Sequence, residues 1–323
     1  MASTSSTTSK AASVKAGGLG VDLDEHAARI GRQDRVATGI LTVIVAFVLF
    51  LLAAIVAFIL IQGLGKAFAP GFLTTPPTDP DNPGISSELF DSFYMLVITL
   101  LISVPISLGA AIFLVEYAPD NWVTKAASTA IETLSSLPSI VVGMFGSLFF
   151  VVTLGWGISI LAGAMALTMF NIPILVRVIQ QALEDVPRSQ RDAGLAMGLT
   201  RWETTLHVLL PAAMPAIVTG VVISAGRVFG EAAALIFTSG SAAVNINFAS
   251  VNLSSPRNPW NIFRPAETLA VHIWKLKMEP SPGNDVIVWG TAAVLLICVL
   301  LFNVLARFLG KALAKKMTSE LAR

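Results

Sequence analysis

Long uncharged stretches alternate with short polar segments along this chain of 323 residues. A helix of about 20 apolar residues crosses the core of a bilayer, so each uncharged stretch of that length is a candidate membrane span. The pattern predicts an all-α integral membrane protein with six transmembrane helices, within a domain of residues 36–310. The expected helices cover residues 36–65, 92–115, 133–176 as two helices joined by a turn at 154–157, 213–237 and 286–306.

The polar segments between the spans are expected to be loops. Residues 121–132 form a short connection, and residues 238–285 form a long outer loop. Two interpretations of residues 266–278 remain open: an interfacial helix over the outer mouth, or a loop packed on a partner subunit. The Ser- and Thr-rich start predicts a disordered cytoplasmic tail over residues 1–35. Within it, residues 22–35 form either a short charged helix at the membrane surface or a solvated linker.

Basic residues lie in the segments that a six-span topology places on one side of the membrane. They are Arg29, Arg32 and Arg35 before the first span, Arg188, Arg191 and Arg201 between the fourth and fifth, and Lys311, Lys315 and Lys316 after the sixth. Cytoplasmic loops carry the excess of Lys and Arg. Both termini, including a C-terminal tail of residues 311–323, are therefore expected in the cytoplasm.

The composition supports a membrane protein and excludes several other classes. Hydrophobic residues make up 54% of the chain and charged residues 13%, and soluble domains have about 25% charged residues. The net charge of +1 gives no sign of nucleic-acid binding. The single cysteine, Cys298, cannot form an intrachain disulfide. The histidines His26, His207 and His272 share no metal-ligand spacing, so we expect neither a metal site nor a cofactor bound by this chain.

Residues 191–211 are polar and charged, although apolar regions flank them on both sides. Their apolar positions fall roughly at helical spacing, and Gly198 interrupts the pattern. Glycine can adopt the positive φ that ends one helix and lets the next leave at an angle. Pro211 marks the return to an apolar span. The segment therefore predicts a bent helix pair suited to docking in a groove of another protein.

The expected fifth span carries two ionisable residues, Arg227 and Glu231, beside Gly230. Ionised groups inside a membrane are costly and usually mark a transport pathway. Their i, i+4 spacing places them on one helix face, within reach of an ion pair. Two interpretations remain open, a substrate pathway and a structural ion pair. Arg177, at the cytoplasmic end of the fourth span, can extend its charge to the interface and is a weaker candidate.

The docking segment resembles the EAA loop of ABC importer permeases. That loop has the pattern E-A-A-x-x-x-G, then nine residues, an apolar residue, one further residue and Leu-Pro. Gly198, Val208, Leu210 and Pro211 fall on the pattern, while Asp192 replaces Glu and Gly194 replaces the second Ala. The resemblance implies a cytoplasmic coupling loop at about residues 186–212. Its expected coupling residues are Asp192, Ala193, Gly194, Gly198, Arg201 and Pro211.

Residues 226–238, GRVFGEAAALIFT, resemble the R-x-x-G-E-T-A-P-L segment of phosphate permeases of the PstA type. Residues 134–146, 186–220 and 261–269 are also similar to that family. The resemblance implies a MetI-like fold in a bacterial plasma membrane and a subunit of an importer of inorganic phosphate, with membrane lipids around it. It implies a PstC-type permease as heterodimer partner, a PstB-type ATPase dimer and a PstS-type phosphate-binding protein. ATP and magnesium would bind to the ATPase, because this chain has no GxxxxGK[ST] motif.

Other functions are less consistent with the sequence. A permease for another oxyanion, such as sulfate, molybdate or phosphonate, fits the docking segment but not the Arg-Gly-Glu segment. An intramembrane enzyme needs a nucleophile and a base at membrane depth; no histidine lies in an expected span and no G-x-S-x-G motif occurs. No catalytic residue is therefore expected. A secondary transporter or channel that acts alone needs no docking loop.

Overall fold

The computed structural model describes residues 19–279 and 281–321, and this part of the chain contains helices and no strand. The chain divides into two units, residues 1–58 and 59–323. The described part of the first unit belongs to α1 (Leu19–Ala67). From Gln33 to Phe58 its side chains are almost all exposed, including large apolar ones such as Phe50. A helix that is apolar all round is suited to lipid or to another apolar surface.

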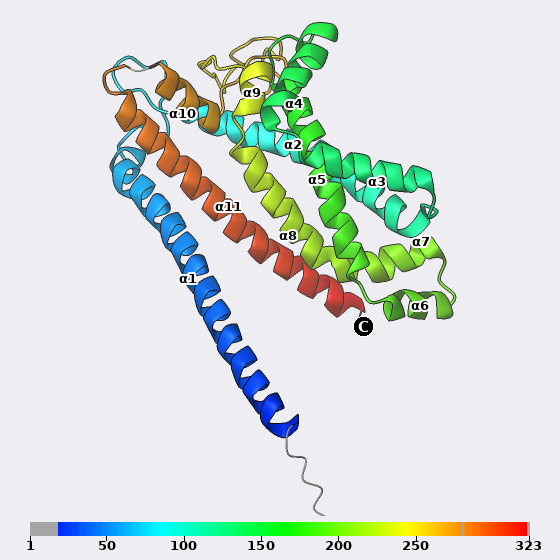
Figure 1. Cartoon of the computed structure of the whole chain (residues 1–323). Coiled ribbons are helices and arrows are strands. Elements are labelled where there is room, and N and C mark those ends of the chain that lie inside the picture. The colour runs from blue at the N-terminus through cyan, green and yellow to red at the C-terminus, as the bar shows by residue number, and fades with distance from the viewer. Residues whose placement is uncertain (1–18, 280, 322–323) are drawn as a thin grey trace, which may run out of the picture. The chain divides into compact units, whose positions relative to one another are not determined.

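The helices of the second unit are shown in Figure 1. They are α2 (Ser86–Ile112), α3 (Trp122–Ser135), α4 (Ser139–Gly146), α5 (Ile160–Glu184), α6 (Arg188–Ala196), α7 (Arg201–Thr204), α8 (Leu210–Phe229), α9 (Ala233–Thr238), α10 (Leu269–Met278) and α11 (Asn284–Leu321). Wider π-helical turns follow α2 at Phe113–Tyr117 and α4 at Ser147–Thr153, and a further one joins α7 to α8 at Thr205–Leu209.

The all-α membrane fold expected from the hydropathy pattern is confirmed. In the described residues, five helical runs are long and apolar enough to cross a membrane, and a sixth span results if a bent pair is counted as one. The bent pair is α3 with α4 and its π-helical turn, which meet at an angle of 100°. Pro138 causes the break, because proline lacks an N–H and disfavours helical geometry in the residue before it.

Three expected boundaries in the middle of the chain are wrong. The connection expected at residues 121–132 is helical from Trp122 onward, where α3 begins. The expected helix 213–237 ends at Phe229, and α9 follows after a break. At its other end, the same helix continues back through the π-helical turn to Arg201. The turn at 154–157 is confirmed, with φ of 68° at both Gly155 and Gly157.

The outer-loop helix and the terminal segments also differ in part from expectation. Of the two interpretations of residues 266–278, the helix is confirmed as α10, and the Thr268 side chain caps it by accepting the Val271 N–H at 3.4 Å. Of the two interpretations of residues 22–35, the structure shows the helical one, as part of α1 from Leu19, so the disorder expected over residues 1–35 is not seen there; residues 1–18 lie outside the described part. The C-terminal tail expected from residue 311 is helical up to Leu321 as part of α11.

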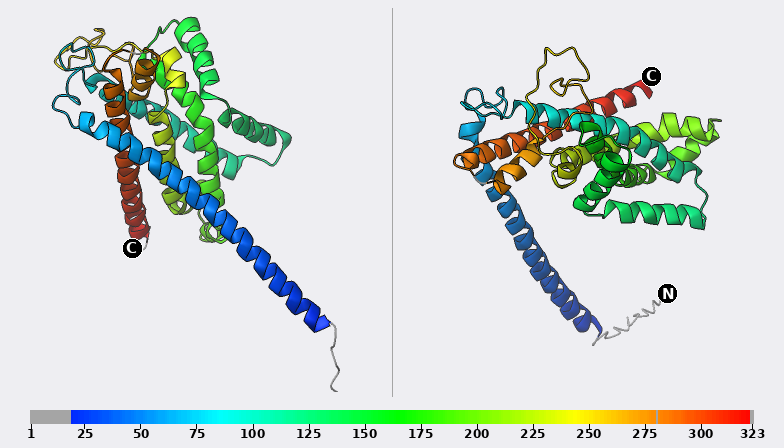
Figure 2. Two further views of the ribbon diagram at one scale, coloured as in Figure 1. Left: turned by 60° about the vertical axis from the view of Figure 1, so that its left-hand side comes forward. Right: turned by 90° about the horizontal axis from the view of Figure 1, so that it is seen from above.

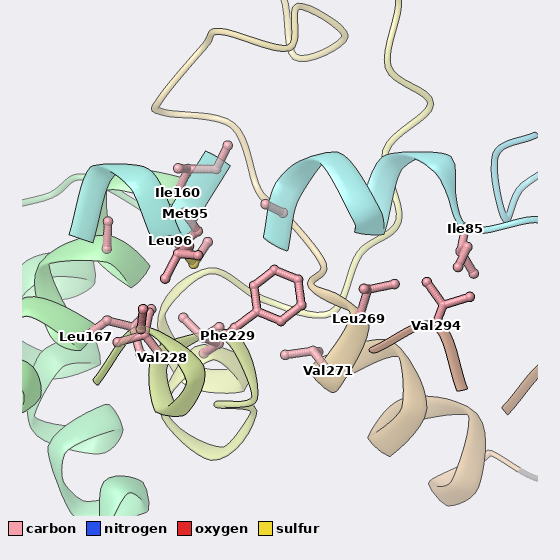
Figure 3. Packing of buried hydrophobic residues seen from close by; sticks show 14 of the residues in the cluster. Ile85, Met95, Leu96, Ile160, Leu167, Val228, Phe229, Leu269, Val271 and Val294 are labelled. Carbon is pink, nitrogen blue, oxygen red and sulfur yellow. The ribbon is translucent and has the colours of Figure 1, made fainter. Parts of the chain in front are cut away.

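Two apolar clusters hold the second unit together. The larger one joins α2, α5, α8, α10 and α11, and Figure 3 shows Phe229 of α8 among residues such as Leu269 and Val271 of α10. The smaller one joins the end of α2 to the C-terminal half of α5 and the beginning of α8. α8 packs against α11 as well as α5, as the views in Figure 2 allow the reader to follow. These contacts fix α8, which carries Arg227.

Candidate functional site

The segment with the EAA-like spacing forms two short helices joined by a tight turn, with α6 below α7 at one end of the view in Figure 1. Gly198 has a φ of +84°, as expected for the residue that ends α6. The Leu199 N–H donates to the Gly194 carbonyl at 3.2 Å and closes the helix end. Thr200 and Glu203 form a capping box that starts α7: the Thr200 hydroxyl accepts the Glu203 N–H at 3.3 Å, and the Glu203 carboxylate accepts the Thr200 N–H at 2.9 Å.

Gly194 of α6 faces Thr204 of α7. A Cβ at Gly194 would lie 2.8 Å from Cγ2 and 3.1 Å from Oγ1 of Thr204, which is buried. Thr204 is β-branched and stiff at χ1, so it cannot easily move aside. Glycine in place of the second alanine of the EAA pattern therefore avoids an overlap with Thr204.

The surface of the two helices is exposed and partly apolar. Asp192, Ala193 and Arg201 are all exposed, and Met197 and Trp202 are 84% and 54% exposed. Large apolar side chains exposed beside charged ones are typical of protein-binding surfaces. We call this surface, formed by α6, the Gly198 turn and α7, the docking face.

Pro211 lies outside the docking face, half-buried in the first turn of α8. It follows the π-helical turn Thr205–Leu209, where the i→i−4 ladder is already interrupted. A proline, which lacks the N–H, is accommodated at such a site. Pro211 therefore lies where the chain passes from the docking face into the membrane-spanning part of α8.

An ion pair ties the docking face to the end of α2. Arg191 of α6 binds Glu116, in the π-helical turn after α2, with 2.5 Å between Nη2 and Oε1. The Glu116 side chain is 7% exposed and that of Arg191 29% exposed, so solvent screens this pair less than a surface pair. The pair connects a docking helix directly to a membrane-spanning helix.

Arg227 lies on α8 with its guanidinium carbon 4.2 Å from the ring centroid of Phe170 on α5, in a cation–π contact. The side chain is otherwise exposed. Among the residues that the structure describes, no carboxylate forms an ion pair with it. The expected pair with Glu231 is therefore absent in this structure, because α8 ends at Phe229 and the i, i+4 geometry of a continuous helix is lost.

Glu231 instead stabilises the start of α9. Its Oε1 accepts the Ala234 N–H at 3.2 Å, which satisfies one of the free donors at a helix N-terminus. Gly230 closes α8 with a φ of −89°, and a Cβ there would meet only backbone oxygens, the nearer at 3.6 Å. Among the described residues, neither strain nor crowding requires glycine at position 230. The two residues form the break between α8 and α9.

Close helix contacts position α9 beyond this break. A Cβ at Gly143 of α4 would lie 2.5 Å from Cα of Ala234, and one at Gly163 of α5 would lie 2.9 Å from Cβ of Ser239. Small residues at these two positions let α4 and α5 approach the α9 segment directly. The α9 segment, which follows Arg227 in the chain, is therefore held by close backbone contacts as well as by side chains.

Arg177, the weaker candidate, pairs with Glu132 of α3 at 2.5 Å. Both side chains are about half exposed, at 46% and 54%. Exposed ion pairs of this type contribute about 0–1 kcal/mol to stability. The contact orients α3 on α5 and gives Arg177 a partner that Arg227 lacks.

Two buried polar groups were missed by the sequence reasoning. Asp91 of α2 and Arg264 of the loop before α10 form a bidentate ion pair, with side-chain exposures of 2% and 0%. Asn171 of α5 donates to Ser103 of α2 at 3.0 Å and accepts a hydrogen bond from Ser224 of α8. Arg264 lies in residues 261–269, which resemble the phosphate permeases, but sequence alone did not reveal its partner.

Comparison with known proteins identifies the class. The chain belongs to the family "Binding-protein-dependent transport system inner membrane component", whose model matches residues 103–319. Members of this family are membrane-embedded permease subunits of ABC importers. They are generally non-catalytic and work with an ATPase and a substrate-binding protein.

Individual relatives agree with this assignment. The chain is 46% identical over 288 residues to "Probable ABC transporter permease protein YqgI" of Bacillus subtilis (strain 168), covering 89% of this chain and 98% of that protein. It is 30% identical over 281 residues to "Phosphate transport system permease protein PstA" of Yersinia pestis, covering 85% of this chain and 89% of that protein. A solved bacterial alginate ABC transporter in complex with its periplasmic protein shares the fold, with a TM-score of 0.55 at 15% identity over 90% of this chain and 97% of that one.

Proposed function

We propose that this chain forms half of the translocation channel of an ATP-driven importer of inorganic phosphate. Arg227 handles the anion, and residues 186–212 couple the channel to the ATPase. The free guanidinium of Arg227 carries the proposal: it is exposed, lies over the Phe170 ring and has no carboxylate partner in the described chain. The relative named as a phosphate permease, at 30% identity over most of both chains, supports phosphate as the anion.

The chemistry of the guanidinium suits this role. Arginine stays charged at any physiological pH, and its planar fork binds two phosphate oxygens at once. The contact with the Phe170 ring uses no hydrogen-bond acceptor, so the N–H donors of the guanidinium have no carboxylate partner among the described residues. Gly230 and Glu231 are assigned to the pathway wall at the end of α8. Glu231 is bound to the Ala234 N–H here, so it would have to leave that contact before it could compete with phosphate for Arg227.

The docking face would bind the ATPase through Asp192, Ala193, Gly198 and Arg201. The buried Gly194 would act indirectly by letting α6 pack on Thr204, with Pro211 as the entry to the span. The Arg191–Glu116 pair would transmit movement of the docking face to α2. A PstC-type permease would complete the channel, a PstB-type ATPase dimer would hold ATP and magnesium, and a PstS-type protein would deliver phosphate. The protein would lie in a bacterial plasma membrane with both termini in the cytoplasm.

Phosphate uptake into reconstituted vesicles, divided by the amount of assembled complex, tests the role of Arg227. Arg227→Gln should assemble normally and lose at least about tenfold in uptake, since a hydrogen bond to a charged group contributes about 1.5–3 kcal/mol and 1.4 kcal/mol is about tenfold. Arg227→Lys should be impaired because it cannot form the bidentate fork. Arg177→Gln removes a paired arginine and serves as the matched control.

The structural alternative has a different outcome. If Arg227 only pins α8 to α5 through Phe170, Arg227→Gln should lower the amount of assembled complex and leave uptake per complex unchanged. Wild-type uptake by assembled Arg227→Gln would reject the proposed role in transport.

A further inference from the structure

A second group of ionisable side chains is buried where the beginning of α2 meets α10 and the loop before it. It consists of Glu88, Glu267 and His272, which are 0%, 1% and 4% exposed. One ligand atom of each residue lies within 4.8 Å of the ligand atoms of the other two. The proposed function uses none of these residues.

The hydrogen bonds of His272 fix which ring nitrogen is available. Nδ1 lies 2.8 Å from Glu267 Oε1, and because a carboxylate oxygen accepts, Nδ1 of the neutral ring carries the proton. Nε2 then keeps its lone pair, and it is buried without a hydrogen-bond partner in the described residues. A carboxylate that accepts one ring N–H while the other nitrogen is left free is the usual arrangement around a metal-binding histidine.

Glu88 presents a second buried atom without a partner. Its Oε2 accepts a hydrogen bond from the Ser87 hydroxyl at 3.1 Å, but Oε1 has no donor among the described residues. A buried acceptor without a partner is costly and calls for an explanation. A cation bound between Glu88 and His272 would satisfy both orphaned atoms at once.

The charges around the group favour a divalent cation. Asp91 is paired with Arg264, which leaves Glu88 and Glu267 as two further fully buried carboxyl groups that can bind a cation once deprotonated. Lys275 donates to Glu267 at 3.2 Å, but its side chain is 27% exposed and partly screened by solvent. A doubly charged ion would neutralise the buried part of the cluster.

We propose that Glu88, Glu267 and His272 bind a divalent transition-metal ion of the zinc or manganese type. One imidazole and two carboxylates match the nitrogen and oxygen ligands that these ions accept, whereas calcium and magnesium prefer oxygen alone. The ion fastens the loop before α10 to the beginning of α2. Sequence spacing gave no reason to expect this site, because its ligands come from segments far apart in the chain.

Zinc retention by the full chain in detergent tests the proposal. The protein is stripped with a chelator, incubated with zinc chloride alone and passed through a desalting column before its zinc content is measured. Wild type should retain one ion per chain, and Glu88→Gln and His272→Gln should bind at least about tenfold more weakly, as expected when a metal site loses a contact. Thr99→Val is the matched control: it changes another buried, unpartnered polar group on α2 and should retain zinc like the wild type.

X-ray absorption at the zinc edge of the wild-type protein gives a readout that needs no variant. It should show nitrogen and oxygen ligands with one imidazole. No retained zinc in the wild type would overturn the proposal, as would equal retention in Glu88→Gln and His272→Gln, or a sulfur ligand from Cys298. A water molecule or a second proton on His272 would also satisfy the orphaned atoms, and both of these alternatives predict that no zinc is retained.

Discussion

Gly198 should be required for its backbone conformation and not for its small size. Its φ is +84°, and a Cβ built there would meet no atom within 4 Å. A side chain is therefore not excluded by space, and only the backbone strain of an L-residue in the left-handed region opposes it. We expect coupling to the ATPase to fall in the order Gly198→Asn, Gly198→Ala, Gly198→Val.

The size of each effect follows from the conformation. Alanine in the left-handed region costs about 1–2 kcal/mol, and a β-branched valine should approach about 3 kcal/mol, at the upper end for such strain. Asparagine occupies this region several-fold more often than most non-glycine residues and should cost less than alanine. Since about 1.4 kcal/mol is a tenfold change in an equilibrium, Gly198→Val should reduce the population of the native turn by about 100-fold relative to wild type.

The assay is ATP hydrolysis by the complex upon delivery of substrate, divided by the amount of assembled complex. Gly198→Val should remain in the membrane and lose stimulated hydrolysis, while Gly198→Asn should keep most of it. Gly155→Val is the matched control, because Gly155 also has a positive φ of 68° with no atom within 4 Å but lies outside the docking face. Full coupling in Gly198→Val, or equal loss in Gly198→Asn and Gly198→Val, would refute the reasoning.

Three further predictions concern packing and orientation. Gly194→Ala should lower coupling through an overlap with Thr204 that costs about 1–3 kcal/mol, and adding Thr204→Ala should restore it; a double variant no better than the single one contradicts the contact. Arg264→Met should destabilise the protein by about 3–5 kcal/mol in thermal unfolding because Asp91 is left buried and unpaired, and adding Asp91→Leu should recover much of the loss; an unchanged melting temperature in Arg264→Met argues against the buried pair. Arg201→Cys, in a background without the native cysteine, should be labelled only from the cytoplasm, and labelling from outside would reject the proposed orientation.

Hydropathy predicted the fold well because apolar length is a local property of the sequence. It placed the apolar spans and the turn at Gly155 and Gly157, and the positive φ at Gly198 followed from glycine chemistry. The breaks were harder to predict, because an uncharged stretch looks the same whether its helix is straight or bent. Pro138 is the local signal in the sequence for the bend between α3 and α4.

In the candidate site, too, the local sequence predicts some residues but not the contacts between segments far apart in the chain. Arg227 is visible in the sequence as a charged residue in an apolar span. Its contact with Phe170 joins α8 to α5, and the residue spacing within either helix does not predict it. The expected pair with Glu231 assumed a continuous helix, and the break after Phe229 turned Glu231 into a cap for α9. The Arg264–Asp91 pair could not be read from the sequence, because its partners meet only after the outer loop folds onto α2.

Stimulation of ATP hydrolysis by a panel of anions tests the central claim most directly. The complete complex, with its permease partner, ATPase and binding protein, would be placed in vesicles and given phosphate, sulfate, molybdate or a phosphonate in turn. We expect that phosphate stimulates hydrolysis and enters the vesicles, and that the other anions do neither. Stimulation by another oxyanion with no response to phosphate would contradict the proposed function, although the chain would still belong to its family of ABC importer permeases.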